Sequence, residues 1–170
     1  MNNTMRIILS AALMASLAAC SKKVKEEAPV ATPEPTKTET PAVVDDGKFD
    51  PSDLDSDSCL RQRVVYFDFD KAEIKAESQA ILACHGKYLT DRPSAAITLE
   101  GHADERGTRE YNLGLGERRG NAVSSALQAN GGAGSQLSVT SYGEERPVCN
   151  DSGEGCWSQN RRVELVYSAK

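Results

Sequence analysis

Apolar and polar positions alternate with two different periods along residues 59–168, which predicts strands and helices in a regular order. Alternation in steps of two predicts a strand, and apolar positions three or four residues apart predict a helix. The strands are expected at 63–67, 96–100, 136–141 and 162–167, and the helices at 75–89 and 108–130. The order βαβα followed by two strands predicts an α/β domain of the α+β sandwich kind. Its mixed four-stranded sheet would carry both helices on one face.

The N-terminus follows a different pattern, typical of a targeting segment. Arg6 precedes an apolar run from Ile7 to Ala18, which is long enough for a signal peptide and too short to span a bilayer. The run ends in Leu17-Ala18-Ala19-Cys20, which resembles a bacterial lipobox. We therefore expect removal of residues 1–19 and lipid modification of Cys20, and Ser21 behind it favours the outer membrane. The alternative is an ordinary signal peptide with an incidental cysteine.

Residues 20–58 are predicted to be the lipidated cysteine followed by a disordered tether. Five of the seven prolines lie here, among threonine, lysine and acidic residues. Such a composition cannot bury enough apolar surface to order itself. A coil of about 38 residues would span roughly 35 Å. Stable anchoring needs two or more acyl chains, and bacterial lipoproteins resemble one another in carrying three.

The charge and composition exclude several classes of protein. The net charge is −5 and aromatic residues make up 5% of the chain, which argues against a nucleic-acid partner. Two histidines leave little material for a histidine-based metal site, and no metal or cofactor is expected.

The second helix places an arginine on its apolar side. With Leu115 at angle zero and 100° per residue, Arg119 falls at about 40° and Asn112 at about 60°. The apolar stripe is completed by Ala122, Val123 and Ala126. A buried charge is costly unless it is paired and hydrogen-bonded. We therefore expect Arg119 to need a carboxylate, from the protein or from a ligand.

Four sequence blocks resemble, in order, the OmpA-like peptidoglycan-binding family. They are VYFDFDKAEI, EGHADERGTREYNLGLGERRGNAV, SYGEERP and QNRRVELVY, and the resemblance extends over about residues 59–168. The lipobox and tether narrow the resemblance to the peptidoglycan-associated lipoproteins of Gram-negative bacteria. The resemblance implies a binding module, not an enzyme, that holds the meso-diaminopimelate residue of the peptidoglycan stem. It also implies an outer-membrane protein of the Tol–Pal system in cell division, with its domain in the periplasm and TolB as a partner.

The same resemblance assigns roles to individual residues. Asp104 would take the ammonium of diaminopimelate and Arg119 its carboxylate. Phe69 and Asp70 would line the pocket, and polar support would come from Thr108, Glu110 and Asn112. The structural alternative is a buried ion pair between Asp104 and Arg119 with Asn112 as hydrogen-bond partner.

Neighbouring residues are expected to have structural roles. Asp70 can equally cap the turn before the first helix. Glu105 and Arg106 are expected to be exposed turn charges, and His85 to be packed in the core. His102 would abut the pocket without partners for a metal. A structural role is also expected for Asn160, Arg161 and Arg162.

Four cysteines remain after Cys20, an even number in an oxidising compartment. We favour the pairs Cys149–Cys156, which closes a short loop, and Cys59–Cys84. The alternative is buried free thiols, which suits Cys84 best.

Two other functions remain open. A peptidoglycan-cleaving enzyme could use carboxylates such as Glu100, Asp104 and Glu105, but no nucleophile with an adjacent base is evident. The other is an OmpA-like protein outside the Tol–Pal system. A flagellar stator subunit, one example, would need a membrane-spanning helix that this sequence does not show.

Overall fold

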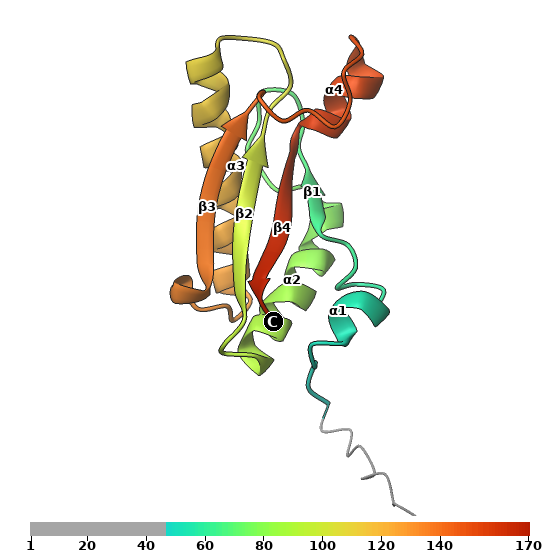
Figure 1. The fold of residues 1–170 in the computed structure, drawn as a ribbon, viewed down its shortest axis with the longest axis vertical. Coiled ribbons are helices and arrows are strands. Elements are labelled where there is room, and N and C mark those ends of the chain that lie inside the picture. Colours follow the sequence, from blue (N-terminus) through green and yellow to red (C-terminus); the bar gives the residue numbers. More distant parts are fainter. Residues whose placement is uncertain (1–46) are drawn as a thin grey trace, which may run out of the picture. The chain divides into compact units, whose positions relative to one another are not determined.

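The computed structural model describes residues 47–170, whose centre is a four-stranded sheet with two long helices on one face (Figure 1). The strands are β1 Val64–Tyr66, β2 Ala96–His102, β3 Leu137–Gly143 and β4 Arg162–Ala169. The helices are α1 Asp53–Ser56, α2 Ala76–Asp91, α3 Arg109–Ala129 and α4 Glu154–Asn160, with a 3-10 turn, η1 Gly134–Gln136. The predicted fold class and mixed sheet are confirmed. Within residues 47–170, no helix is long and apolar enough to cross a membrane.

The sheet has the order β1-β4-β2-β3, and this order decides where the loops meet. β4 is antiparallel to both β1 and β2, while β2 and β3 are parallel. The C-terminal ends of β1, β2 and β3 therefore lie at the same end of the sheet as the start of β4. The segments that follow these three strands and the residues that precede β4 converge at this end.

The core lies between the sheet and the two long helices. It is built from Leu82 and Leu89 of α2, Leu127 of α3, and the inward-facing residues Leu99 and Leu165 of the sheet. His85 is wholly buried, as expected, and its two ring nitrogens are 2.7 Å from the Tyr167 hydroxyl and 3.0 Å from the Gln62 carbonyl oxygen. The expectation that His85 is packed in the core is therefore confirmed.

Glycines let α3 lie very close to β2 and β3. A Cβ on Gly101 would overlap the carbonyl oxygen of Gly116, and a Cβ on Gly120 would lie 2.5 Å from the Val139 side chain. Only glycine permits backbones to approach in this way. Because Arg119 stands between two of these glycines, the close approach brings it against the end of β2.

The folded part begins before Cys59, whereas the tether was expected to continue to residue 58. Leu54 of α1 is buried in the core. The backbone N–H of Phe49 donates to Asp91 Oδ2 at 3.0 Å, and Arg92 Nε donates to the Phe49 carbonyl at 2.8 Å. A four-residue helix with one buried leucine leaves no periodic signal, which explains the difference. The predicted signal peptide, lipobox and most of the tether lie outside the described residues.

Two disulfides close short segments of the domain. Cys59 pairs with Cys84 and Cys149 with Cys156, with Cα atoms 6.3 and 5.3 Å apart. These separations are ordinary for disulfides. The first joins α2 to the segment before β1, and the second closes the loop that leads into α4.

Candidate functional site

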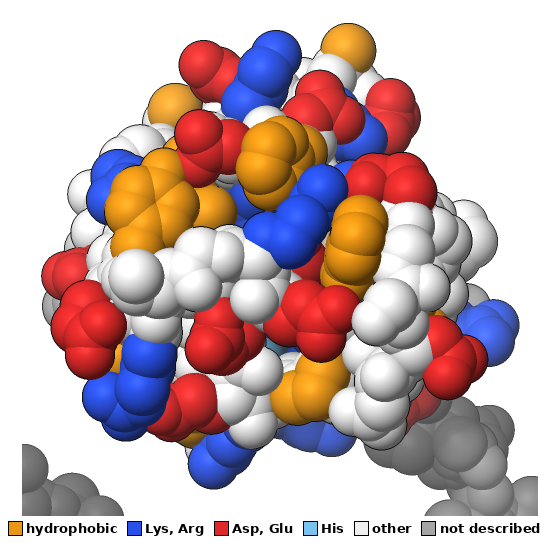
Figure 2. Space-filling view, turned by 90° about the horizontal axis from the view of Figure 1, so that it is seen from above, with side chains coloured by type: hydrophobic (Ala, Val, Ile, Leu, Met, Phe, Trp, Pro, Cys, Tyr) orange, Lys and Arg blue, Asp and Glu red, His pale blue; other side chains and the backbone are white. Residues whose placement is uncertain are grey.

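A cavity of about 200 Å³ opens where the loops after β1 and β2 meet the first turns of α3. Figure 2 looks down on this end of the domain, where basic side chains lie between apolar ones near the middle of the face. The cavity is lined by Phe69, Asp70, Asp104, Arg106, Gly107, Tyr111, Asn112, Leu115 and Arg119. Five of the seven residues that the sequence assigned to the ligand therefore surround one space.

Arg119 forms the floor of this cavity and is fully buried, as its position on the helical stripe predicted. Its guanidinium donates to three backbone carbonyls: Nε to Lys71 at 2.8 Å, Nη1 to His102 at 2.8 Å, and Nη2 to Asp68 at 3.1 Å. No carboxylate within residues 47–170 forms an ion pair with it. The structural alternative of a direct Asp104–Arg119 pair is therefore wrong.

No carboxylate among the described residues contacts the charge of Arg119, and Asp104 and Asp70 act on it only through longer-range electrostatic attraction. Burial, reinforced by the nearby Arg161 cation, lowers the pKa of Arg119 to about 10, which still leaves it charged at neutral pH. The three carbonyls accept one hydrogen bond from each guanidinium nitrogen, which leaves two of the five N–H groups for a ligand and does not cancel the charge. The floor of the cavity is thus a cation that an anionic ligand group would stabilise.

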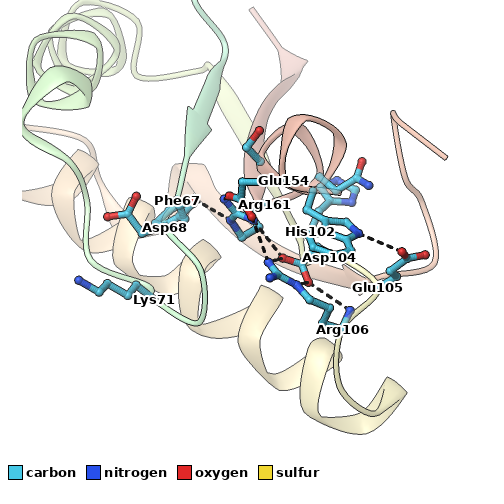
Figure 3. A network of polar contacts seen from close by, with 12 residues as sticks. Phe67, Asp68, Lys71, His102, Asp104, Glu105, Arg106, Glu154 and Arg161 are labelled. Atoms are coloured by element: carbon cyan, nitrogen blue, oxygen red, sulfur yellow. Dashed lines mark hydrogen bonds and ion pairs between the residues drawn. The ribbon is translucent and has the colours of Figure 1, made fainter. Parts of the chain in front are cut away.

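Asp104 is 4% exposed and is held by two arginines (Figure 3). Arg106 binds it through Nε at 3.1 Å and Nη2 at 2.6 Å, and Arg161 Nη1 donates to it at 3.2 Å. Burial alone would raise the pKa of Asp104, but the hydrogen bonds from Arg106 and Arg161 outweigh it and hold the pKa below its ordinary value. Asp104 is therefore an ionised carboxylate at neutral pH.

Arg106 is not the exposed turn charge that was expected. Its guanidinium lies between two aromatic rings, 3.9 Å from the centre of Phe69 and 4.2 Å from that of Trp157, and its side chain is 31% exposed. Guanidinium groups stack favourably on aromatic faces. The ring of Trp157 is oriented by a 2.9 Å hydrogen bond from Nε1 to Glu105.

Arg161 also belongs to this network, although only a structural role was expected for it. Besides Asp104, it contacts the Phe67 carbonyl through Nε at 3.1 Å and donates to Glu154 through Nη2. Asn160 next to it has a structural role, because its amide bonds the backbone of Val148 and Cys149 and so closes the disulfide loop. Arg161 lies in one of the four sequence blocks, but the sequence did not indicate its contact with Asp104. That contact arises because β4 pairs with β2.

Phe69 and Asp70 stand at the mouth of the cavity, where the sequence placed them. Asp70 has a positive φ of 57°, which is uncommon for a residue other than glycine. Its carboxylate accepts a hydrogen bond from the Tyr111 hydroxyl. Asp70, which was expected to cap the turn before α2, lies within that turn, and α2 begins only after Lys75. Tyr111 was not assigned to the site from the sequence.

The three remaining candidates divide between the cavity and the helix end. Asn112 lines the cavity and donates from Nδ2 to the carbonyls of Asp104 at 3.1 Å and Arg106 at 3.2 Å, so it holds the loop in place. Thr108 caps α3, with its hydroxyl accepting from the Tyr111 N–H at 3.3 Å. Glu110 is exposed in the first turn of α3, and neither it nor Thr108 lines the cavity.

His102 lies beside the site but does not line it. Its side chain is buried, and neither ring nitrogen has a hydrogen-bond partner among the described residues. Burial, together with the neighbouring Arg162 cation, lowers the pKa of His102 to about 4. The ring is therefore neutral at pH 7, and its role here is to offer its backbone carbonyl to Arg119.

Comparisons with known proteins agree with the fold and with the sequence blocks. Residues 66–161, more than half of the chain, match the model of the OmpA family. The peptidoglycan-associated lipoprotein of Pasteurella multocida is 37% identical over 167 residues, which covers 98% of this chain and all of that protein. That of Haemophilus influenzae is 38% identical over the same share of both chains.

Solved structures show the same relationship. The crystal structure of the peptidoglycan-associated lipoprotein from Burkholderia pseudomallei is 44% identical and superposes with a TM-score of 0.67, covering 68% of this chain and 98% of that one. The C-terminal domain of Helicobacter pylori MotB shares the fold at 21% identity, with a TM-score of 0.57 and coverage of 62% and 83%. The chain therefore belongs to the OmpA family, among its peptidoglycan-associated lipoproteins.

Proposed function

We propose that this protein binds the diaminopimelate-containing stem of peptidoglycan in the cavity above Arg119 and so ties the outer membrane to the cell wall. The end of the diaminopimelate side chain carries an ammonium and a carboxylate on one carbon. A site for this group therefore needs a fixed anion for the ammonium and a fixed cation for the carboxylate, both on the walls of one small cavity.

The observation that carries the proposal is the charge of Arg119. It is buried at the cavity floor and none of the described carboxylates pairs with it, while Asp104 on the same cavity is an ionised acid. A ligand carboxylate at Arg119 would supply the missing counter-charge, and charge-assisted hydrogen bonds of this kind are strong yet reversible. Phe69 and Tyr111 at the rim are available to cover the aliphatic part of the ligand.

Binding without catalysis fits the same geometry. A glycosidase needs one carboxyl group with a raised pKa to act as the acid. The pKa of Asp104 is lowered instead, and its two oxygens are occupied by arginine N–H groups. The chemistry requires no cofactor.

The wider role follows from the predicted lipobox. Lipid on Cys20 would anchor the chain in the outer membrane, and the tether would let the domain reach the cell wall from the periplasm. We further propose that the protein acts in the Tol–Pal system in envelope integrity and cell division, with TolB as partner. If TolB uses the surface around the cavity, it and peptidoglycan exclude each other.

Pull-down with purified sacculi tests the proposal. Asp104→Asn should weaken binding tens- to thousands-fold, because losing one member of a desolvated charge pair costs about 2–5 kcal/mol. Asp55→Asn is the matched control, since Asp55 is an exposed residue of α1 and lies outside the cavity. Normal sacculus binding by a folded Asp104→Asn protein would overturn the site. Release of soluble muropeptides by the unaltered protein would instead support the alternative function, a peptidoglycan-cleaving enzyme.

A further inference from the structure

The carboxylate that should receive the ligand's ammonium is already occupied. Arg106 covers both oxygens of Asp104, and the backbone N–H of Arg106 donates to Oδ1 at 3.1 Å. Arg161 takes a further position on Oδ2. An ammonium can reach Asp104 at close range only if one of the two guanidinium groups moves away.

The two arginines differ in how firmly they are held. The Arg161 side chain is 5% exposed and also bonds the Phe67 carbonyl and Glu154. The Arg106 side chain is 31% exposed, and apart from Asp104 it has ring contacts and a 3.6 Å ion pair with Glu154. Arg106 is therefore the group that can leave.

We propose that Arg106 is a latch that the ligand displaces: in the free protein it fills the ammonium position on Asp104, and binding swings it out from between Phe69 and Trp157. The inference rests on the proposed function and adds how the site selects its ligand. Figure 3 shows Arg106 and Arg161 meeting at Asp104, with Glu154 beside Arg161.

The structure also offers a place for the displaced group. Glu154 Oε2 is already 3.6 Å from Arg106 Nη2, while Oε1 accepts from Arg161, so the Arg106 guanidinium can move onto Oε2 without releasing Arg161. Gly107, directly after Arg106, has a φ of 114°, a conformation that glycine adopts without steric cost. A short movement of Arg106 toward Glu154 exchanges one carboxylate partner for another.

The latch sets a requirement on the ligand. A neutral group cannot replace a guanidinium on Asp104 without leaving a desolvated carboxylate poorly paired. Only a ligand that carries a cation can displace Arg106 from Asp104. Only a ligand that also carries a carboxylate can bind Arg119. Arg106 thus makes the site selective for a zwitterion at some cost in affinity.

The test is calorimetric titration of the purified protein with meso-diaminopimelate, comparing Arg106→Ala and Arg106→Lys with the unaltered chain. Arg106→Ala should bind roughly tenfold tighter, because the ligand no longer displaces an ion pair and two stacking contacts. Arg106→Lys should fall between them, since lysine keeps the charge but cannot bind bidentately or stack equally well. Arg109→Ala removes an exposed arginine that pairs with Glu145, and it should leave binding unchanged.

Trp157 is the single tryptophan of the chain, so its fluorescence reports the latch directly. Saturating diaminopimelate should change the emission of the unaltered protein, as the cation leaves the ring, and should leave that of Arg106→Ala unchanged. Binding without an emission change, or an Arg106→Ala protein that binds as poorly as Asp104→Asn, would overturn the latch and make Arg106 a ligand contact. A chain that binds neither diaminopimelate nor sacculi would overturn the proposed function together with the latch.

Discussion

Replacing Arg119 by methionine tests whether this residue supports the fold as well as the proposed ligand. Methionine keeps the length and the apolar part of the side chain but removes every donor. Three backbone carbonyls, those of Lys71, His102 and Asp68, lose their hydrogen bonds from the guanidinium. They belong to the loop after β1 and to the end of β2, so the loss loosens the region that shapes the cavity.

The magnitude follows from those three bonds. At about 1 kcal/mol net each, their loss lowers the free energy of unfolding by about 3 kcal/mol. Carbonyls left without partners increase the loss, whereas the desolvation cost of a buried cation, which methionine does not carry, reduces it. Domains of this size are stable by about 5–15 kcal/mol, so the variant should remain folded at 25 °C.

Urea unfolding followed by circular dichroism measures the effect. A loss of about 3 kcal/mol moves the midpoint down by about 1–3 M. The control is Arg118→Met at the adjacent position, where the exposed arginine lies over the Tyr111 ring at 5.4 Å and makes no buried hydrogen bond. Equal midpoints for the two variants would refute the claim that Arg119 ties these segments together.

Two further predictions concern stability. Gly101→Ala should lower the free energy of unfolding by about 3 kcal/mol, since the new methyl group meets the Gly116 backbone, whereas Gly155→Ala meets nothing within 4 Å and serves as control; thermal melting distinguishes them. The free energy of unfolding should also fall by about 2 kcal/mol between pH 7 and pH 5. In the unfolded state His102 takes up a proton below about pH 6.5, whereas in the folded state its pKa is about 4. Lowering the pH through this range therefore favours the unfolded state. Urea midpoints at the two pH values measure this, and a flat profile would contradict the burial of a neutral ring.

The sequence contained enough to place Arg119 and the fold, but not the partners of Arg119. The helical period put Arg119 on the buried side of α3, and the structure agrees. A carboxylate partner was expected because charge pairing is the usual answer to burial. The structure instead supplies backbone carbonyls from the loop after β1 and from the last residue of β2, and backbone carbonyls carry no residue-specific signal.

Arg106 and Trp157 were overlooked for a related reason. A charge in a turn is usually solvated, and nothing near Arg106 in the sequence indicates two flanking rings. Trp157 lies in α4, which has seven residues and follows a disulfide-closed loop, so neither helical nor strand periodicity marks it. Only the placement of β4 between β1 and β2 brings this segment to the end of β2.

The most direct measurement for the proposed function is calorimetric titration of the protein with a stem peptide that contains meso-diaminopimelate, beside the same peptide with lysine in its place. The two peptides share the side-chain ammonium and differ in the carboxylate that Arg119 would bind. We expect binding of the diaminopimelate peptide and little or none of the lysine peptide. Equal affinities would mean that the carboxylate is not recognised, and would contradict the account of Arg119 as the ligand's partner.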